Sequence, residues 1–277
     1  MKKRIASTIL AVACTSSLIF SGCAITDSLS YANADKYTAG GGSVAGTVTE
    51  IEIDWIDGNV EIAYGDVTEV TFSETSKEAL TTEYTLHYWL ENTTLHIKCG
   101  ENRKFISASN FPEKDLKVIL PASLPLNKLD LEAVDTNVKI DHVTIGDVEI
   151  ETVDGAVNAY LGGITREISV NTVEGDITVN ADSIEEFDIE TVGADVYLES
   201  VSAPRTGSFE SVGGSFTLAL YEGVEGFTVE VDGLGGNFES DFETTKQGDA
   251  YKHGNGACQY EAETVGGNVT VVKKTAK

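Results

Sequence analysis

Apolar and polar residues alternate along most of this chain, and a short turn interrupts the alternation at regular intervals. The clearest copy of the turn is Thr152-Val153-Asp154-Gly155. With its central apolar residue as position zero, copies fall at Ile56, Val134, Val153, Val173, Val192, Val212, Leu234 and Val265. The steps from Val134 to Val265 are 19, 20, 19, 20, 22 and 31 residues. Alternation is typical of strands, and a period near 20 is too short for stacked helix pairs. The pattern therefore predicts an all-β fold, a single-domain parallel β-solenoid (β-helix-like) with about 20 residues per coil.

One face of each predicted strand supplies the core. Residues at positions −5, −3 and −1, such as Val148, Ile150 and Thr152, share this face. Coils stacked about 4.8 Å apart would align equivalent side chains into ladders. We expect the Thr and Ser residues at −1 to hydrogen-bond along their ladder, and the Gly at +2, as in Gly155, to supply the positive φ of a tight corner.

The opposite face is acidic. Of the sixteen residues at positions −4 and −2, thirteen are acidic and none is basic. The acidic ones are Glu52, Asp54, Asp130, Glu132, Glu149, Glu151, Asp188, Glu190, Glu210, Glu230, Asp232, Glu261 and Glu263. Positions +5 and +7, after the turn, are mixed in character. The sequence therefore predicts one acidic wall beside a nearly neutral one.

Two interpretations of the acidic wall remain open. Stacked carboxylates keep a protein soluble and discourage edge-to-edge aggregation. They could also recruit cations, such as Ca²⁺ between coils, or a basic partner. Any Ca²⁺ site would be weak, because such ladders do not by themselves enclose the six to eight oxygens that Ca²⁺ takes. We assign no cofactor and no metal ligand.

The chain divides into four parts. Residues 1–22 are expected to form a lipoprotein signal peptide, 23–46 a lipidated cysteine and flexible tether, 47–128 irregular amino-terminal β coils, and 129–277 the regular solenoid with an insertion at 244–256. Trp55 stands where the clearest copy has Thr152, which predicts that residues 51–62 form a terminal coil covering one open end. Residues 260–272 are expected to supply the closing coil at the other end.

The amino terminus indicates export and anchoring. A cationic start, Met1-Lys2-Lys3-Arg4, precedes an apolar stretch too short to be a comfortable membrane span. The stretch ends in Phe20-Ser21-Gly22-Cys23, which resembles a bacterial lipobox, although Phe20 stands where Leu is usual. The resemblance implies that Cys23 receives a diacylglyceryl group, and two acyl chains suffice for stable anchoring. The expected location is extracytoplasmic, on a bacterial cell membrane through the lipid.

Charge and cysteine content narrow the remaining possibilities. After cleavage before Cys23, 16 basic residues face 45 acidic ones, a net charge of −29, which argues against nucleic acid as a partner. Cys99 and Cys258 then remain, each in phase with apolar neighbours. Two free core cysteines are the simpler interpretation, with a disulfide as the alternative.

Three stretches together resemble a known family. They are the segment 31–40, the segment Ile53-Asp54-Trp55-Ile56-Asp57-Gly58-Asn59-Val60, and the repeated Glu-Thr-Val-x-Gly-x-Val. This combination is similar to the putative-adhesin β-strand-repeat family, bacterial envelope lipoproteins long grouped as a domain of unknown function. The resemblance covers nearly all of residues 31–277 and implies a solenoid. It brings no catalytic residues.

No pattern in the sequence points to catalysis. Polysaccharide lyases with parallel β-helices use a Lys or Arg base, yet between positions 129 and 245 the basic residues are Lys139, Arg166 and Arg205, none at an acidic-wall position. The four histidines lack metal-ligand spacing. We predict a non-catalytic, adhesin-like binding or scaffold module at the envelope that takes a polysaccharide or a membrane protein. The alternatives are an envelope-stress or signalling accessory that binds a membrane protein through residues 66–128 and, third, a polysaccharide-active enzyme.

Overall fold

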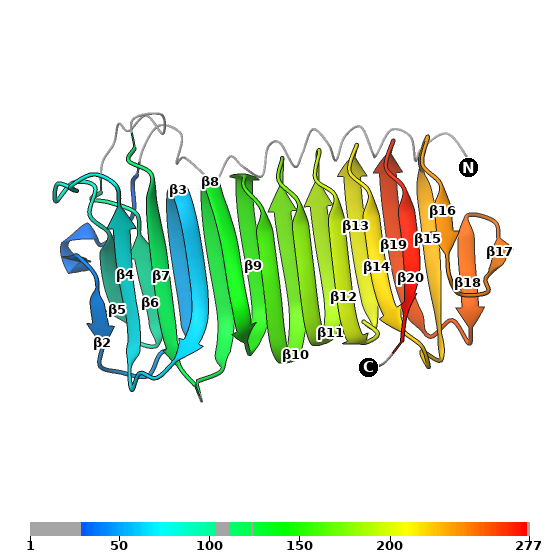
Figure 1. Ribbon diagram of the computed structural model, residues 1–277, viewed down its shortest axis with the longest axis horizontal. Helices are drawn as coiled ribbons and strands as arrows, with labels where there is room; N and C mark the ends of the chain where they lie inside the picture. Colours follow the sequence, from blue (N-terminus) through cyan, green and yellow to red (C-terminus); the bar gives the residue numbers. More distant parts are fainter. Residues whose placement is uncertain (1–28, 103–110, 123, 276–277) are drawn as a thin grey trace.

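The computed structural model describes residues 29–102, 111–122 and 124–275. Its strands stack side by side into an elongated solenoid (Figure 1). Apart from a short 3-10 helix, η2 (Ala34–Lys36), the elements of the described segments are strands. The all-β parallel solenoid predicted from the alternation is therefore confirmed. No helix in these segments is long and apolar enough to cross a membrane.

Each regular coil has a strand on one wall, a corner turn, and a strand on a second wall. The strands of these coils are β8 (Leu126–Val143), β9 (Ile145–Asp154), β10 (Val157–Thr172), β11 (Ile177–Thr191), β12 (Val196–Ser202), β13 (Thr206–Val212) and β14 (Phe216–Tyr221). Neighbouring coils pair in parallel and in register, with Ile168 opposite Val148 and Val157 opposite Ile177. A strand such as β10 begins on the second wall and bends onto the first wall of the next coil, with its register shifting after Leu161.

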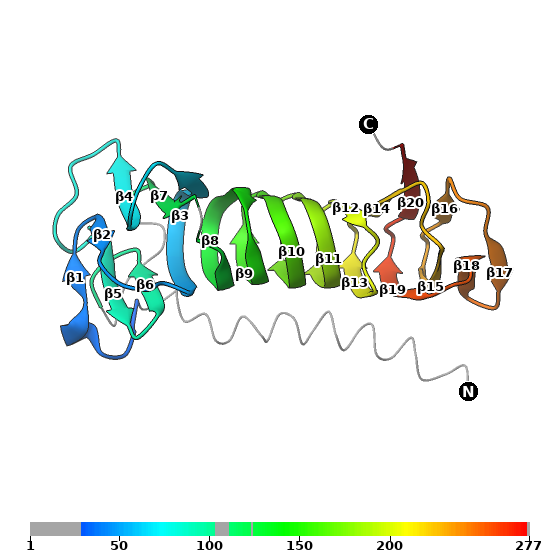
Figure 2. The ribbon, with the colours of Figure 1, turned by 90° about the horizontal axis from the view of Figure 1, so that it is seen from below.

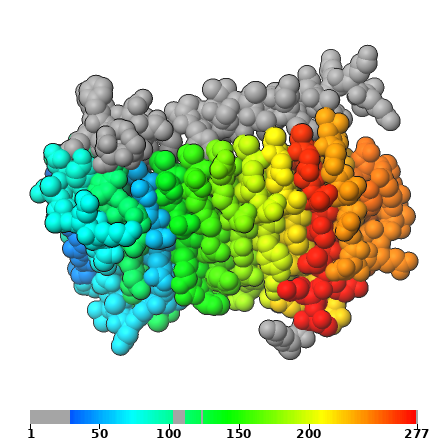
Figure 3. All heavy atoms as spheres, turned by 45° about the horizontal axis from the view of Figure 1, so that its top comes forward, coloured from blue at the N-terminus to red at the C-terminus, as the bar shows by residue number. Residues whose placement is uncertain are grey.

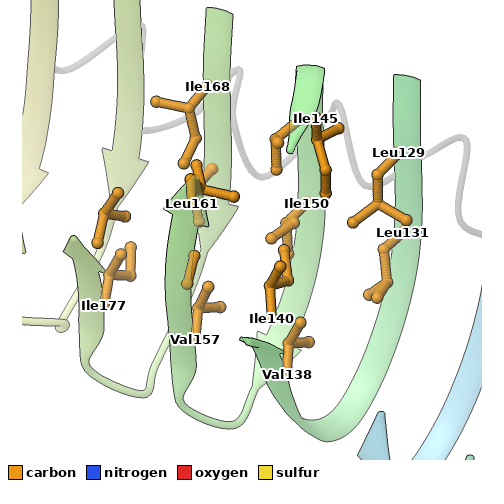
Figure 4. Close-up of a cluster of buried hydrophobic side chains, with 14 of the residues drawn as sticks. Leu129, Leu131, Val138, Ile140, Ile145, Ile150, Val157, Leu161, Ile168 and Ile177 are labelled. Atoms are coloured by element: carbon orange, nitrogen blue, oxygen red, sulfur yellow. The ribbon is translucent and has the colours of Figure 1, made fainter. Parts of the chain in front are cut away.

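The core lies between the two walls. Val148 and Ile150 of one wall and Val157 and Ala159 of the other are at most 1% exposed, as the alternation predicts. Figure 4 shows the same arrangement through several coils, with Leu129, Leu131, Val138 and Ile140 pointing into the space between the walls. One contiguous apolar cluster runs through the described coils. Burial of these rows is the main favourable contribution to folding.

The hydroxyl groups at position −1 are buried but do not bond along their ladder. Thr152 Oγ1 donates to Asp154 O at 2.9 Å, and Thr172 Oγ1 donates to Glu174 O at 2.7 Å. In a different turn, Thr191 Oγ1 accepts from the backbone N–H of Ala194 at 3.0 Å. The predicted ladder of hydroxyl bonds is wrong, because the backbone of the same turn is closer than the next coil and satisfies each hydroxyl locally.

The glycine at +2 has two different roles. Gly155 has φ +115°, as predicted for a tight corner, whereas Gly214 is outside the positive-φ set and its neighbour Gly213 has φ +109°. A Cβ on Gly214 would lie 1.8 Å from Ala194 O. At this second type of turn, glycine is therefore required by the close approach of the next coil rather than by a positive φ.

A row of polar side chains at position +3 links successive corners. Asn137 Oδ1 accepts from Ala156 N at 3.0 Å, and Asp195 Oδ1 accepts from Ser215 N at 2.8 Å. The same pattern continues where Asn268 Oδ1 accepts from Asn237 N at 3.1 Å. These bonds satisfy corner N–H groups that the strand ladders leave out. The sequence signal was the Asn, Asp or Ser found at +3 in all copies but one.

The amino-terminal end does not follow chain order. Its strands are β1 (Thr38–Ala39), β2 (Gly42–Val44), β3 (Glu50–Gly65), β4 (Val70–Ser76), β5 (His87–Glu91), β6 (Thr94–Lys98) and β7 (Lys114–Pro121). Strand β3 pairs with β6 and β7 on one side and with β8 on the other. The prediction that residues 51–62 form a terminal coil is therefore wrong. The later strands β6 and β7 lie outside β3, and the antiparallel strands β5 and β4 cover them.

The carboxyl-terminal end shows the same exchange of order. Its strands are β15 (Gly226–Leu234), β16 (Phe238–Ser240), β17 (Thr245–Gln247), β18 (Ala250–Gly254), β19 (Cys258–Val265) and β20 (Val269–Lys274). Strands β19 and β20 lie between β13 and β14 on one side and β15 and β16 on the other, visible as a red band between yellow and orange in Figure 3. The last segment of the chain is thus not the closing coil that the sequence predicted. Seen from below, β17 and β18 stand at that end, opposite β1, β2, β4 and β5 (Figure 2).

Both described cysteines are free, as the simpler interpretation predicted. Cys99 is buried beside the amino-terminal strands, and Cys258 is partly buried at the start of β19. Burial raises the pKa of the Cys99 thiol to about 12. The Cys99 thiol therefore does not resemble a reactive cysteine.

Candidate functional site

The predicted acidic face is one continuous surface, which we call the acid wall. It consists of the outward residues of β3, β8, β9, β10, β11, β13, β19 and β15, in that spatial order. In the row at position −2, successive coils place Asp54, Glu132, Glu151, Asn171, Glu190, Glu210, Glu263 and Asp232 side by side. In the row at −4 stand Glu52, Asp130, Glu149, Ser169, Asp188, Ser208, Glu261 and Glu230. The structure therefore brings together all thirteen predicted carboxylates.

Basic residues neutralise the amino-terminal end of the acid wall. Lys98 Nζ lies 2.7 Å from Asp54 Oδ2, and His96 Nδ1 donates to Glu52 Oε2 at 2.7 Å. Both partners come from β6, 44 residues away in sequence. The bond from His96 lowers the pKa of Glu52, whereas burial raises the pKa of Asp54 despite Lys98. At this end of the wall, Glu52 and Asp54 are therefore paired with basic side chains of the neighbouring strand.

The described part of the segment predicted as a flexible tether packs against this end instead, with β1 paired to β5 and β2 paired to β4. The ring of Tyr37 lies 5.7 Å from that of Trp89 and 6.4 Å from that of His96, and Trp89 stacks on His96 at 5.5 Å. Burial and the nearby Asp54 raise the pKa of the Tyr37 hydroxyl above its usual range. Aromatic packing thus covers His96, whose side chain is 13% exposed, whereas the side chain of Asp54 is 21% exposed and that of its neighbour Glu52 is 42% exposed.

Lys128 is the next compensating charge along the wall. Its Nζ lies 3.0 Å from Asp130 Oδ2 and 2.7 Å from Glu149 Oε2, so one lysine bridges two coils. Lys128 lies outside the two predicted acidic rows because it stands at −6, one row beyond them. The signal was available, since the outward alternation continues through −6 in the same strand.

Beyond Glu149, the −2 row is a run of carboxylates in a half-buried setting. Burial, followed by neighbouring carboxylates, raises the pKa of Glu151 and of Glu263. Burial and nearby Asp188 raise the pKa of Glu190. For Glu210, burial and the flanking Glu190 and Glu263 raise the pKa to about 7. A cation placed here would favour the charged forms and relieve this mutual repulsion.

Polar neutral residues interrupt the acid wall at three places. Asn171 stands between Glu151 and Glu190 in the −2 row. Ser169 and Ser208 stand in the −4 row, and Ser208 Oγ donates to Asp188 Oδ1 at 2.5 Å. Asp188 is therefore partly satisfied within the wall. The longest unbroken carboxylate run in the −2 row is Glu190, Glu210, Glu263 and Asp232.

An apolar row borders the acid wall at the corner. It consists of the position-zero residues, which we call the valine row: Val134, Val153, Val173, Val192, Val212, Val265 and Leu234. Val192 is 39% exposed, Val212 36% and Leu234 67%. These residues stand at the centre of the predicted turns. The fold leaves part of the row in contact with solvent.

The second wall has its charges paired. Glu199 accepts hydrogen bonds from the hydroxyls of Tyr197 at 2.6 Å and Tyr221 at 2.7 Å, and Lys274 Nζ lies 3.1 Å from it. Lys139 bridges Glu61 at 3.0 Å and Asp141 at 3.7 Å. The predicted contrast between an acidic wall and a nearly neutral one is present in the structure.

The geometry gives no support to a specific metal centre on the wall. Among residues 29–102, 111–122 and 124–275, no group of three or more His, Cys, Asp or Glu side chains could hold a metal ion. The carboxylates are instead spread along two rows, with at most one per coil in each row. Cys23, the predicted lipidation site, lies outside the described residues.

Comparisons with solved structures return proteins of low sequence identity. A protein described as a putative cell adhesion protein from Clostridium sporogenes is 12% identical, with a TM-score of 0.42 over 86% of this chain and 100% of that one. A putative adhesin from Parabacteroides distasonis is 18% identical, with a TM-score of 0.39 over 86% and 97%. A putative lipid binding protein from the same species is 13% identical, with a TM-score of 0.44 over 85% and 96%.

The search of curated proteins found no match. A family model does match, over residues 48–272, which is most of the chain and includes every coil of the acid wall. The chain belongs to the Toastrack DUF4097 family.

Proposed function

We propose that this protein is a lipid-anchored, extracytoplasmic, non-catalytic binding or scaffold module of the bacterial envelope, and that the acid wall is its binding surface. The observation behind this proposal is the row of carboxylates from Glu151 to Asp232, broken only at Asn171, which the fold does not require. Each like-charged pair about 5 Å apart costs roughly 0.8 kcal/mol at the dielectric of water. Screening over a Debye length of about 8 Å removes only part of this cost.

The partner best suited to this wall is a basic protein segment. Two rows with at most one carboxylate per coil in each do not surround an ion with the six to eight oxygens typical of Ca²⁺. An anionic polysaccharide would be repelled by the same charges. Lys and Arg side chains, in contrast, can each contact carboxylates from adjacent coils, as Lys128 does with Asp130 and Glu149.

The non-catalytic part of the proposal rests on the kind of groups that the wall offers. Its carboxylates lie on a flat face, whereas active sites are typically concave with a few convergent polar groups. The raised pKa of Glu210 arises from burial and like-charged neighbours, which an acidic ladder produces without any catalytic role. A hydrolase or lyase activity lost on removal of wall carboxylates would contradict this part of the proposal.

The lipid anchor is supported by the Phe20-Ser21-Gly22-Cys23 sequence. Substitution Cys23→Ala in the full-length protein should move it from the membrane fraction to the soluble extracytoplasmic fraction. Retention of the variant in the membrane fraction would contradict lipid anchoring at Cys23.

The binding surface is tested by capture experiments with the full-length protein, comparing membrane-protein extracts with envelope polysaccharide. The variant Glu151→Gln/Glu190→Gln/Glu210→Gln/Glu263→Gln removes four wall charges. A matched control, Glu222→Gln/Glu225→Gln/Glu239→Gln/Glu243→Gln, removes four carboxylates off the wall, all of them exposed. We expect capture of a basic membrane protein to be lost only in the wall variant. Capture that survives in the wall variant would contradict the acid wall as binding surface and favour residues 66–128.

A further inference from the structure

The valine row is an apolar strip with no covering segment among the described residues. The side chains at its carboxyl-terminal half are the most exposed, with Leu234 at 67%. Strand pairing places Val212, Val265 and Leu234 next to one another on adjacent coils. Exposed apolar residues scattered singly need no explanation, but a contiguous strip rimmed by charge is typical of an interaction site.

Carboxylates flank the strip on one side along nearly its whole length and on the other side in part. The first border is the −2 row of the acid wall, including Glu190 and Glu210. Around the corner, exposed acidic residues at positions +1 and +3 flank the strip as far as the coil of Val192, and the corresponding positions beside Val212, Val265 and Leu234 are Gly, Ser or Asn; the acidic residues are Asp135, Asp154, Glu174, Asp176 and Asp195. A complementary partner therefore needs an apolar stripe with basic residues along its acid-wall border, and on both borders beside the coils of Val134 to Val192. That is the surface of a basic amphipathic helix.

The dimensions also favour a helix. Coils stack about 4.8 Å apart, which is close to the 5.4 Å pitch of an α-helix lying along the solenoid axis. An extended strand repeats its side chains on one face about every 6.7 Å, which differs more from the coil spacing, so its side chains would fall out of register with the coils sooner. The strip spans seven coils, a length of about 29 Å, which corresponds to a helix of about 20 residues.

We propose that the valine row and its flanking carboxylates form the docking site for a basic amphipathic α-helix of a partner protein, with apolar residues on the valine row and Lys or Arg residues on the carboxylates. This inference rests on the proposed function, since it specifies the partner of the same wall. An amphipathic helix presents apolar anchors at i, i+3, i+4 and i+7, which here would contact successive coils.

The test uses two 20-residue peptides and the full-length protein at fixed ionic strength, with binding followed by fluorescence anisotropy. The first peptide has Leu at i, i+3, i+4 and i+7 and Lys on both borders. The second has the same composition shuffled to remove the helical periodicity. We expect the amphipathic peptide to bind about tenfold more tightly, because only it can place its Leu residues on the valine row.

Protein variants locate the effect. The substitutions Val192→Thr/Val212→Thr/Leu234→Gln should abolish the tenfold preference. The control Tyr160→Gln/Ile164→Thr/Val201→Thr, at apolar residues exposed elsewhere, should preserve it. Equal binding of both peptides, or a preference that persists in the valine-row variant, would overturn the docking site. If the two peptides bind equally and their binding is lost on removal of acid-wall charges, the docking site is wrong but the proposed function stands. If capture of a membrane protein is unchanged in the acid-wall variant, both the docking site and the acid wall as binding surface are wrong.

Discussion

The two ends of the acidic −2 row carry the same residue type in different electrostatic settings. Asp54 has a side chain only 21% exposed and is paired with Lys98, whereas Glu190 and Glu210 are half-buried and have carboxylates on the neighbouring coils. Where the fold buries the wall, it supplies a cation, because an uncompensated buried charge is strongly destabilising. Where the wall remains open, the charge stays uncompensated. We call the part of the −2 row from Glu190 to Asp232, where no cation of the described residues compensates the carboxylates, the open stretch, and the end at Asp54 the covered end. The difference in compensation identifies the open stretch as the part available to a partner.

The largest expected change in stability comes from removing Lys98, the cation that compensates the charge of Asp54. Lys98→Met keeps the apolar stem of the side chain but leaves Asp54 buried without its cation. We expect a loss of about 3 kcal/mol in the free energy of unfolding at pH 7, measured by denaturant titration. The loss should diminish at low pH, because protonation of Asp54 removes the unpaired charge.

A double substitution separates the ion pair from simple packing. In Lys98→Met/Asp54→Asn, most of the lost stability should return, since neither charge remains. A double variant as unstable as Lys98→Met alone would show that the pairing between Asp54 and Lys98 is not what stabilises this end.

The second-largest expected effect is a gain in stability, and it comes from removing a charge in the open stretch. Glu210→Gln removes a charge flanked by Glu190 and Glu263, and we expect a gain of about 1 kcal/mol in stability near pH 8. Because folding raises the pKa of Glu210 from 4.5 to about 7, the folded state binds the proton more tightly. The wild-type protein therefore loses stability at this site as the pH rises from 4.5 through 7.

The measurement is the difference in melting temperature between wild type and Glu210→Gln across this pH range. The difference should be near zero at pH 4.5 and reach its full value above pH 7. A difference that does not vary with pH would contradict the assignment of Glu210 as a strained carboxylate, because packing alone has no such dependence.

The sequence was sufficient to predict which residues form the core and which form the outer faces of the walls, but not the order in which the coils stack. Alternation identifies Val148 and Ile150 as core and Glu149 and Glu151 as surface, because the side-chain period of a strand is two. It does not state which coil stacks on which. Strand β3 lies inside the stack because β6 and β7 pair with it from later in the chain. The compensation of Asp54 by Lys98 follows from that exchange and could not be predicted from the period.

The candidate site was likewise predicted in part. The acidic rows were visible in the sequence, but the valine row was not recognised, since an apolar residue at a corner is consistent with either burial or exposure. Position zero of the first copy, Ile56, is 1% exposed, whereas the equivalent Leu234 is 67% exposed. The chain covers the corner at one end and leaves it open at the other, which depends on tertiary structure alone.

The smallest expected effect comes from adding a cation to the −2 row, as Lys98 supplies one at the covered end. Asn171 interrupts the −2 row between Glu151 and Glu190, so Asn171→Lys would place a cation between two carboxylates. We expect a stability gain of about 0.5 kcal/mol, because exposed ion pairs contribute little. The same substitution should weaken binding of the amphipathic basic peptide several-fold at fixed salt, since it repels the partner at the centre of the wall. Asn171→Gln is the control for side-chain size. A lysine variant that is more stable yet binds the peptide as tightly as the control would show that stability and binding depend on different carboxylates. The repulsion that destabilises the fold would then lie at other residues than those that bind the partner.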